Sequence, residues 1–456
     1  MFDIKKCKKI YMCGIGGTSM SGIAEILNKW GYEVVGSDAV KSKQTDWLES
    51  TGIKVFIGQK KENISDDLDL FVYTAAVKED NPEYMEAKKK NILMMERGIF
   101  LGEITKLFKD TIGISGTHGK TSTTSMVAIA FMEAGLDPSI QVGSNLNILN
   151  GNFRVGNSDY FVIEACEYSD SFLNFKERSA IVLNIDDDHL DYFGTIDNTQ
   201  KSFEKYVSML PKDGFLVINN DDFRCVEISK HTKAKVITVG AKNNSEWYYD
   251  NISFDDDGYP SYDCYHNNKY VDTIKLQVVG IHNIFNSLCA LALCDAYGIS
   301  VDVFKRVMLK FTGAERRLEF KGTFNGAKVF DDYGHHPTEI DAVVKGISNK
   351  KFNESWVIFE PHTYSRLVQH MKEFAKVLAE FDHIIIIDIY AAREKNTFNV
   401  SEDDLINEIK KLGKDAIHIS DYDEIKDYLG KNINKGDIII TLGAGYVTKI
   451  ASLLTK

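Results

Sequence analysis

Short apolar runs alternate with longer amphipathic stretches along most of the chain. In the first hundred residues the apolar runs predict strands at 10–13, 33–36, 54–57, 70–74 and 92–95. Intervening stretches with apolar residues at helical spacing predict helices at 20–30, 82–90 and 98–108. Strands that alternate with helices are typical of a parallel sheet in an α/β layer fold. We therefore predict a first α/β domain over residues 1–108, with a Rossmann-like sheet.

The alternation starts again near residue 111 and a third time after residue 317. Central strands are predicted at 111–115, 160–164, 180–184, 215–218 and 235–239, with helices at 199–208, 282–297 and 301–311. Residues 246–278 alternate apolar and polar positions between turn signals, which predicts antiparallel hairpins. The last strands are predicted at 328–331, 356–359, 383–388, 416–419 and 437–441. We therefore predict an α/β protein with a central domain at 109–316 and a second Rossmann-like domain at 317–456.

Composition narrows the class of protein without naming a function. The 456 residues are 44% hydrophobic, and the net charge of −12 argues against a nucleic-acid partner. The seven cysteines are scattered and form no CxxC pair, which favours reduced thiols over a disulfide framework or a zinc site. No apolar run approaches the length of a membrane span. We expect a soluble, cytoplasmic protein.

Residues 113–124 carry the most informative motif, Gly-Ile-Ser-Gly-Thr-His-Gly-Lys-Thr-Ser-Thr-Thr, between a predicted strand and a predicted helix. Two glycines allow backbone N–H groups to close around an anion at a helix N-terminus. The lysine can reach the outer phosphates, and the threonine hydroxyl after it can ligate Mg²⁺. Ile114 stands where the strict P-loop pattern has a glycine, and a turn that merely starts a helix is the alternative. We predict that ATP binds at Gly116, Thr117, His118, Gly119, Lys120, Thr121 and Ser122.

A second glycine-rich turn comes after the first predicted strand. Gly14-x-Gly16-x-x-Ser19, with Asp38 at the end of the next strand, is similar to a dinucleotide fingerprint, although Ser replaces the third glycine. This spacing favours a diphosphate or nucleotide at a helix N-terminus, and a nicotinamide cofactor is one of several possible ligands. A purely structural tight turn is the alternative.

Carboxylates and a histidine come after two of the central strands. Glu164 directly ends an apolar run and is the best candidate for a Mg²⁺ ligand beside the phosphate loop. Glu167 and Asp170 lie just beyond it, and a solvated loop or a helix cap explains them equally well. The segment Asn-Ile-Asp-Asp-Asp-His-Leu-Asp at 184–191 also comes after a strand. His189 is a candidate ligand for a second metal ion, with a structural histidine as the alternative.

Further polar clusters occur at the end of the predicted central domain and in the third domain. His282, Asn283 and Asn286 open a predicted helix, where the amides can read adenine or Asn283 can cap the helix. Arg316 and Arg317 come next, and one guanidinium can reach a transferring phosphoryl group. Histidine and arginine gather after third-domain strands at 331–337 and 361–366, and the segments 390–394 and 443–445 close the same edge.

Taken together these motifs resemble the Mur ligase family. The resemblance covers essentially the whole chain and depends on the motifs at 14–22, 116–121, 187–191, 282–286, 331–339 and 361–366. It implies three α/β domains, for a UDP-sugar, for ATP, and for presentation of an amino acid. The implied reaction is ATP-dependent ligation of L-alanine to the lactyl carboxylate of UDP-N-acetylmuramate through an acyl phosphate, a cytoplasmic step of peptidoglycan precursor synthesis.

The resemblance also implies roles for individual residues. The catalytic group comprises Lys120, His189, Arg317, His336 and Arg366. The metal ligands are Thr121, Glu164 and His189, and the nucleotide contacts beyond the phosphate loop are His282, Asn283, Asn286, Arg317 and Asp332. The substrate contacts are Gly14, Gly16, Gly17, Thr18, Ser19, Asp38, His336, His362 and Arg366.

Three residues differ from the family pattern. Thr363 stands where many relatives carry Arg, Cys166 where many carry Asp, and Glu204 where sister ligases carry a carbamylated lysine. Three other functions compete with this interpretation. The nearest competitor is a recycling ligase that adds an intact tripeptide to the same UDP-sugar. A nicotinamide oxidoreductase and a non-catalytic ATP-dependent interaction protein are the others. The sequence leaves a monomer and a homodimer equally open.

Overall fold

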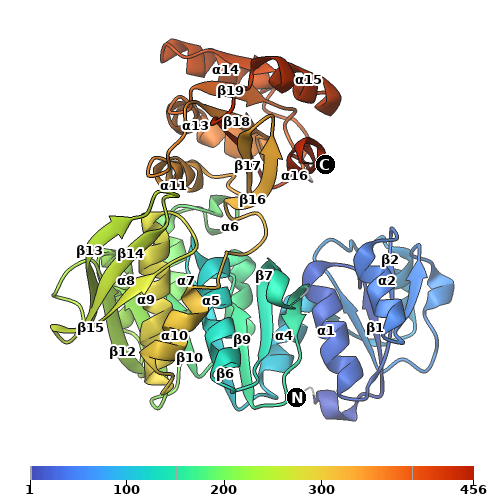
Figure 1. Cartoon of the computed structure of the whole chain (residues 1–456). Helices are drawn as coiled ribbons and strands as arrows, with labels where there is room; N and C mark the ends of the chain where they lie inside the picture. The colour runs from blue at the N-terminus through green and yellow to red at the C-terminus, as the bar shows by residue number, and fades with distance from the viewer. Residues whose placement is uncertain (1–2, 150, 393, 456) are drawn as a thin grey trace. The chain divides into compact units, whose positions relative to one another are not determined.

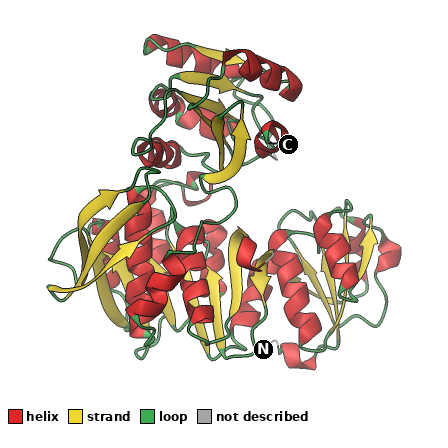
Figure 2. Ribbon diagram, viewed as in Figure 1, coloured by secondary structure: helices red, strands yellow, loops and turns green. Residues whose placement is uncertain are grey.

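The computed structural model describes residues 3–149, 151–392 and 394–455 (Figure 1). The chain divides into two compact units. The first unit contains residues 1–248, 266–269 and 286–307. The second contains residues 249–265, 270–285 and 308–456. Helices flank the strands in both units, as the α/β class requires (Figure 2).

The N-terminal sheet of the first unit is parallel throughout, in the order β3-β2-β1-β4-β5. Its strands are β1 Lys9–Cys13, β2 Glu33–Asp38, β3 Lys54–Ile57, β4 Leu70–Tyr73 and β5 Leu93–Glu96. Its helices are α1 Thr18–Lys29, α2 Lys43–Ser50, α3 Pro82–Lys89 and α4 Arg97–Thr105, with short 3-10 turns at Ile4–Lys6 and Lys61–Asn63. Apolar side chains of α1 and β1, such as Ile23 and Ile10, are fully buried in the core between helix and sheet.

A larger sheet forms the rest of the first unit, in the order β12-β11-β10-β6-β9-β7-β8, and the start of β13 pairs with β12. The strands are β6 Asp110–Ser115, β7 Ser139–Leu146, β8 Gly151–Arg154, β9 Tyr160–Glu164, β10 Ser179–Val182, β11 Phe215–Asn219, β12 Lys235–Gly240 and β13 Trp247–Phe254. Only the pairing of β7 with β8 is antiparallel among the pairs described within this part of the sheet. The carboxyl ends of β6, β9 and β10 therefore meet at one edge, where α/β proteins bind ligands.

The helical segments of the central region are α5 Lys120–Glu133, α6 Leu190–Phe193, α7 Ile196–Ser208, α8 Phe223–Ser229, α9 Ile281–Ala296 and α10 Val301–Met308. Two 3-10 segments, Asn147–Leu149 and Tyr168–Asn174, come after β7 and β9 respectively. Helix α5 begins directly after the phosphate loop, so its N-terminus faces the same edge of the sheet as the ends of β6 and β9.

The second unit contains most of β13 and the strands β14 Pro260–His266 and β15 Lys269–Lys275. Asn267 and Asn268 join these two strands, and both have positive φ. Two consecutive residues with positive φ form the tight turn that the strand twist of an antiparallel hairpin favours. The predicted hairpin is therefore present here.

A six-stranded sheet completes the second unit, in the order β16-β17-β21-β18-β19-β20. Its strands are β16 Glu319–Phe324, β17 Ala327–Asp332, β18 Ser355–Phe359, β19 His383–Ile386, β20 Ala416–His418 and β21 Ile438–Leu442. All described pairs are parallel except β16 with β17. One face carries α11 Pro337–Ile347, α12 Tyr364–Gln369, α13 Met371–Leu378 and α14 Glu402–Lys411, and the other carries α15 Tyr422–Asn432 and α16 Thr448–Leu454.

Two compositional expectations can be compared with the structure. All seven cysteines are free thiols, and six of them are buried. Among the described residues, no helix is both long and apolar enough to cross a lipid bilayer.

The buried carboxyl group of Glu177, next to the central sheet, predicts how the free energy of unfolding depends on pH. Glu177 is only 7% exposed, accepts a hydrogen bond from the Tyr206 hydroxyl, and lies over Gly113 of β6. Burial raises the pKa of Glu177 to about 8. Between roughly pH 4.3 and 8 the unfolded chain loses a proton that the folded chain retains, so Glu177 makes folding less favourable as pH rises.

Replacing Glu177 with Gln should remove this pH dependence. Relative to Glu177→Gln, the unfolding free energy of the wild type should fall by up to about 1.4 kcal/mol per pH unit across that window. Urea unfolding at several pH values measures the difference. The control is Glu204→Gln on α7, a carboxylate that is partly exposed, which should keep the wild-type slope. Parallel profiles for wild type and Glu177→Gln would contradict the prediction.

Candidate active site

The phosphate loop joins β6 to α5 through two glycines in the left-handed half of backbone space. Gly116 has φ of 129° and Gly119 has φ of 87°. A Cβ atom added at Gly119 would lie 2.7 Å from Oδ1 of Asn286, so only glycine leaves this approach open. The N–H groups at the start of α5 lie at the end of this loop. This arrangement fits a phosphate chain at a helix N-terminus.

Asn184, after β10, fixes the other side of the loop. Its backbone oxygen accepts from the Thr117 N–H at 3.1 Å, and its Oδ1 accepts from the His118 N–H at 2.7 Å. The Thr117 hydroxyl accepts from the backbone N–H of Asp186 at 2.9 Å. A contact of 3.2 Å with the His118 ring holds the pKa of Asp186 well below its usual range. The loop is therefore tied to the neighbouring strand by its own backbone.

Lys120 points back into the loop and meets a buried carboxylate. Its Nζ donates to the carbonyl oxygens of Gly116 at 2.6 Å and Thr117 at 3.0 Å, and to both oxygens of Glu167 at 2.9 and 3.1 Å. The Glu167 side chain is 2% exposed. Burial is the largest single influence on Lys120 and lowers its pKa, but the neighbouring charges, that of Glu167 first among them, and the hydrogen bond to Glu167 together outweigh it, so the net pKa lies above the usual range. Lys120 is thus a fixed cation.

Thr121 and Glu164 adjoin each other as a pair of oxygen ligands. The Thr121 hydroxyl donates to Glu164 Oε2 at 3.0 Å, and the backbone N–H of Gly143 donates to the same oxygen at 2.8 Å. A Cβ atom at Gly143 would lie 2.6 Å from the carboxylate. A hydroxyl beside a carboxylate suits Mg²⁺, which prefers oxygen ligands. The donor set fits the predicted ion.

His189 lies beside Glu167 at the start of α6. Its backbone has φ of 57°, and its Nε2 is 3.9 Å from Glu167 Oε1 and 3.7 Å from Asp188 Oδ2. The ring packs against Tyr168 with centroids 4.7 Å apart. The structure therefore brings Lys120, Glu167 and His189 together.

Glu167 is the residue whose role the sequence left open. The alternative of a solvated loop is wrong for its side chain, which is buried, whereas Asp170 bonds the hydroxyls of Tyr192 and Ser202. Its position three residues beyond Glu164, after a strand that leads to the ligand edge, was the available signal. Its burial depends on Lys120, which lies 47 residues earlier in the chain.

The glycine loop after β1 is held in place by Asp38, which is one of the predicted substrate contacts. Gly14 has φ of 82°, and the Gly16 N–H donates to Asp38 Oδ2 at 3.0 Å. Gln141 donates to the Ser19 hydroxyl at 2.9 Å. Asp38 therefore shapes the turn that carries Gly14, Gly16, Gly17, Thr18 and Ser19.

In the second unit, Asp332 ends β17 in a buried position. Its carboxylate accepts from the N–H groups of Leu318 and Gly334, both at 2.7 Å. Burial raises the pKa of Asp332 to about 6, against the opposing charge of Arg317. Arg317 Nη1 is 4.0 Å from Glu339 Oε1, whereas Arg316 bonds the carbonyl groups of the Gly443–Gly445 turn. Of the two arginines, Arg316 is therefore committed to a structural role.

Histidine rings gather at the same edge of the second unit. Arg366 Nη1 lies 2.9 Å from His362 Nδ1, and the His335 ring lies 5.1 Å from that of His362. His336 caps α11 by accepting from the Thr338 N–H at 3.4 Å. The predicted His362 and Arg366 thus lie together, and His336 has a local structural bond in addition to any other role.

The two asparagines of the predicted adenine site differ in their contacts. Asn283 Nδ2 donates to the Val279 carbonyl at 2.8 Å and lies 3.2 Å from His282 Nε2. Asn286 lies against Gly119 of the phosphate loop. Within the segment 390–394, Arg393 lies outside the described residues.

Comparison with known proteins matches the whole length of the chain. Family models match residues 9–109 (Mur ligase family, catalytic domain), 114–294 (Mur ligase middle domain) and 316–445 (Mur ligase, glutamate ligase domain). A curated relative from Lachnoclostridium phytofermentans, named UDP-N-acetylmuramate–L-alanine ligase, is 45% identical over 100% of this chain and 99% of its own.

Two solved structures extend the comparison. The UDP-N-acetylmuramate-alanine ligase of Thermotoga maritima is 26% identical, with a TM-score of 0.83 over 98% of both chains. A murein peptide ligase from Psychrobacter arcticus is 25% identical, with a TM-score of 0.71 over 98% of both chains. The three-domain α/β expectation and the sequence resemblance are confirmed, and the chain belongs to the Mur ligase family of enzymes.

Proposed function

We propose that this protein joins L-alanine to the lactyl carboxylate of UDP-N-acetylmuramate, using ATP and passing through an acyl phosphate. The observation that carries the proposal is the phosphate loop, in which a buried Lys120–Glu167 pair adjoins the Thr121–Glu164 pair. The name of the 45% identical relative supports the choice of substrates. The product is a precursor of peptidoglycan, so the proposed location is the cytoplasm.

In this proposal each predicted domain has one task. Residues 1–108 bind the UDP-sugar through Gly14, Gly16, Gly17, Thr18, Ser19 and Asp38. Residues 109–316 bind ATP, and residues 317–456 present the amino acid. The proposed partners are the two substrates alone, without nucleic acid or membrane insertion, in a monomer or a homodimer.

The first chemical step transfers the γ-phosphoryl group to the lactyl carboxylate. Two anions must meet, so fixed positive charge is the main requirement. Lys120, held in place by Glu167, supplies positive charge at the phosphate loop. Arg317, at the predicted boundary between the central and third domains, supplies a second positive charge. Thr121 and Glu164 would hold Mg²⁺ and His189 a second ion, and the ions neutralise charge on the phosphate oxygens when bound.

Other residues position the nucleotide and the acceptor. His282, Asn283 and Asn286 are assigned to adenine, and Asp332 to the ribose. His336, His362 and Arg366 are assigned to the acceptor side, where the amine of L-alanine attacks the acyl carbon and inorganic phosphate leaves. Exclusion of water during this step protects the acyl phosphate from hydrolysis.

The alternative is a recycling ligase, and a murein peptide ligase shares the fold over nearly the whole chain. The higher TM-score with the L-alanine enzyme of Thermotoga maritima and the name of the 45% identical relative favour L-alanine.

A substrate comparison separates these candidates. With ATP, Mg²⁺ and UDP-N-acetylmuramate present, addition of L-alanine should release inorganic phosphate and give a product heavier by one alanyl residue. Malachite green detection and mass spectrometry measure the two. Phosphate release with the tripeptide L-alanyl-γ-D-glutamyl-meso-diaminopimelate alone would move the protein to the recycling class.

A second test concerns the lysine in the phosphate loop. Glu167→Gln removes the charge that fixes Lys120, and we expect kcat to fall by roughly 10²-fold, the scale seen when one preorganised electrostatic contact is lost. The matched control is Asp170→Asn in the same 3-10 segment, whose side chain bonds Ser202 and Tyr192 and should leave kcat nearly unchanged. Equal kcat values for Glu167→Gln and wild type, with folding retained, would remove Glu167 from the proposed site.

A further inference from the structure

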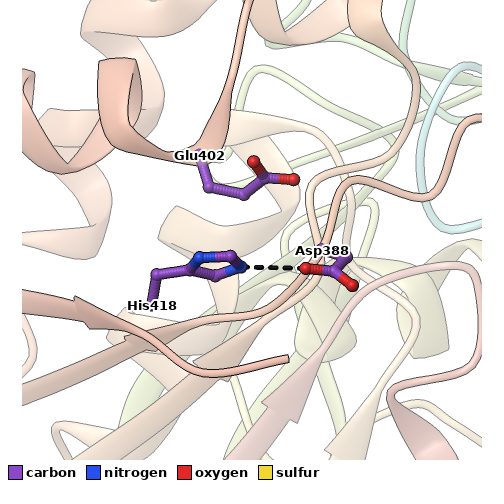
Figure 3. Close-up of side chains that lie close together, drawn as sticks. All are labelled: Asp388, Glu402 and His418. Atoms are coloured by element: carbon purple, nitrogen blue, oxygen red, sulfur yellow. Dashed lines mark hydrogen bonds and ion pairs between the residues drawn. The ribbon is translucent and has the colours of Figure 1, made fainter. Parts of the chain in front are cut away.

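Three side chains of types that ligate metal ions converge in the second unit, and none of them is among the residues assigned above (Figure 3). His418 is the last residue of β20, Asp388 lies two residues beyond β19, and Glu402 is the first residue of α14. One ligand atom from each lies within 4.8 Å of the others. His418 Nε2 is 2.9 Å from Asp388 Oδ1.

We propose that Asp388, Glu402 and His418 bind a divalent transition-metal cation, and that Zn²⁺ is the ion they fit best. Imidazole nitrogen and carboxylate oxygen both ligate Zn²⁺, whereas Mg²⁺ favours oxygen ligands alone and retains several waters. Tetrahedral Zn²⁺ with bonds of about 2.0–2.2 Å places its ligand atoms roughly 3.3–3.6 Å apart.

The backbone holds the three ligands in register. Ile386 of β19 pairs with His418 of β20, which fixes the histidine beside the loop that carries Asp388. The Ile389 N–H donates to Glu402 Oε1 at 2.8 Å, and the Ser420 hydroxyl donates to Asp388 Oδ1 at 2.6 Å. Such outer hydrogen bonds orient metal ligands in known sites.

The charge of the site favours a cation. Among the residues that the structure describes, neither the Asp388 nor the Glu402 carboxylate forms an ion pair with lysine or arginine. The ion-pair partner of Asp388 is His418. Among the described residues, the two carboxylates therefore have no lysine or arginine that a bound metal ion would have to displace.

The ion would join the two ends of one loop. Asp388 and Glu402 bound a segment whose described residues, 389–392 and 394–401, form no helix or strand, and this segment carries Tyr390 and Glu394. The Tyr390 carbonyl accepts from the Thr363 N–H at 2.9 Å, and Glu394 accepts from the Ser365 N–H at 3.0 Å. A cation that links both ends restricts the loop and stabilises its contacts with the segment 361–366. The proposed role is structural and does not depend on the proposed reaction.

Titration of the full-length protein with Zn²⁺ against a chromophoric chelator tests the site. We expect tight binding of one Zn²⁺ that depends on His418. Because loss of a partner outside the metal ligands already costs 10–100-fold in affinity in known sites, His418→Ala should weaken this binding by at least about 100-fold.

His383→Ala is the matched control. His383 begins β19 in the same sheet, and its Nε2 lies 2.9 Å from Glu354. It is part of a histidine–carboxylate pair outside the three-residue cluster, so His383→Ala should bind Zn²⁺ like the wild type. Substitution of Co²⁺ for Zn²⁺ should give visible absorption that is present in wild type and His383→Ala and absent in His418→Ala.

Three outcomes would overturn the proposal. They are equal Zn²⁺ affinity in wild type and His418→Ala, an equal loss of affinity in His383→Ala, and absence of a stoichiometric site in the wild type. Competition by Mg²⁺ at equal concentration would overturn the assignment to a transition metal. The readout is metal binding alone, so failure here is distinguishable from failure of the proposed ligase activity.

Discussion

The phosphate loop depends on one buried contact, between the ammonium group of Lys120 and the carboxylate of Glu167. Removing either partner leaves an uncompensated buried charge, which typically costs about 3–5 kcal/mol. The contact also has a geometric role, since the same ammonium group bonds two carbonyl oxygens of the loop. One ion pair therefore sets both the charge and the shape of the site.

The parallel sheet makes this contact possible. Ile114 of β6 pairs with Glu164 of β9, so the two strands reach the ligand edge at the same level. The loop after β6 and the carboxylates after β9 then meet although they are distant in sequence. The second unit is built on the same principle, because Asp332 is the last residue of β17 and the histidine cluster comes after β17 and β18.

Much of this could be predicted from the sequence, because buried parallel strands are short apolar runs. The strands at 54–57 and 160–164 have the predicted bounds, and the glycines of the phosphate loop were identified by their spacing. The sequence did not predict β7, which contains Gly143, Ser144 and Asn145, or the antiparallel edge strand β16. Neither has the continuous apolar run of a central strand. Helix α2 was also missed, because it is short and mostly polar.

The functional residues divide in a similar way. Local motifs identified Lys120, Thr121 and Glu164, whose positions are set by one strand and one loop each. The burial of Glu167 and the meeting of Asp388, Glu402 and His418 depend on strand pairing and on helix placement, so no local pattern contained them. The roles assigned to individual site residues, and the domain bounds at 108 and 316, stay predictions.

The central claim is that the loop transfers a phosphoryl group to the lactyl carboxylate, and isotope transfer tests it most directly. UDP-N-acetylmuramate labelled with ¹⁸O in that carboxylate would be incubated with the protein, ATP, Mg²⁺ and L-alanine, and the released phosphate analysed by mass spectrometry. An acyl phosphate intermediate predicts one carboxylate ¹⁸O in each inorganic phosphate. Unlabelled phosphate released together with alanylated product would contradict the account.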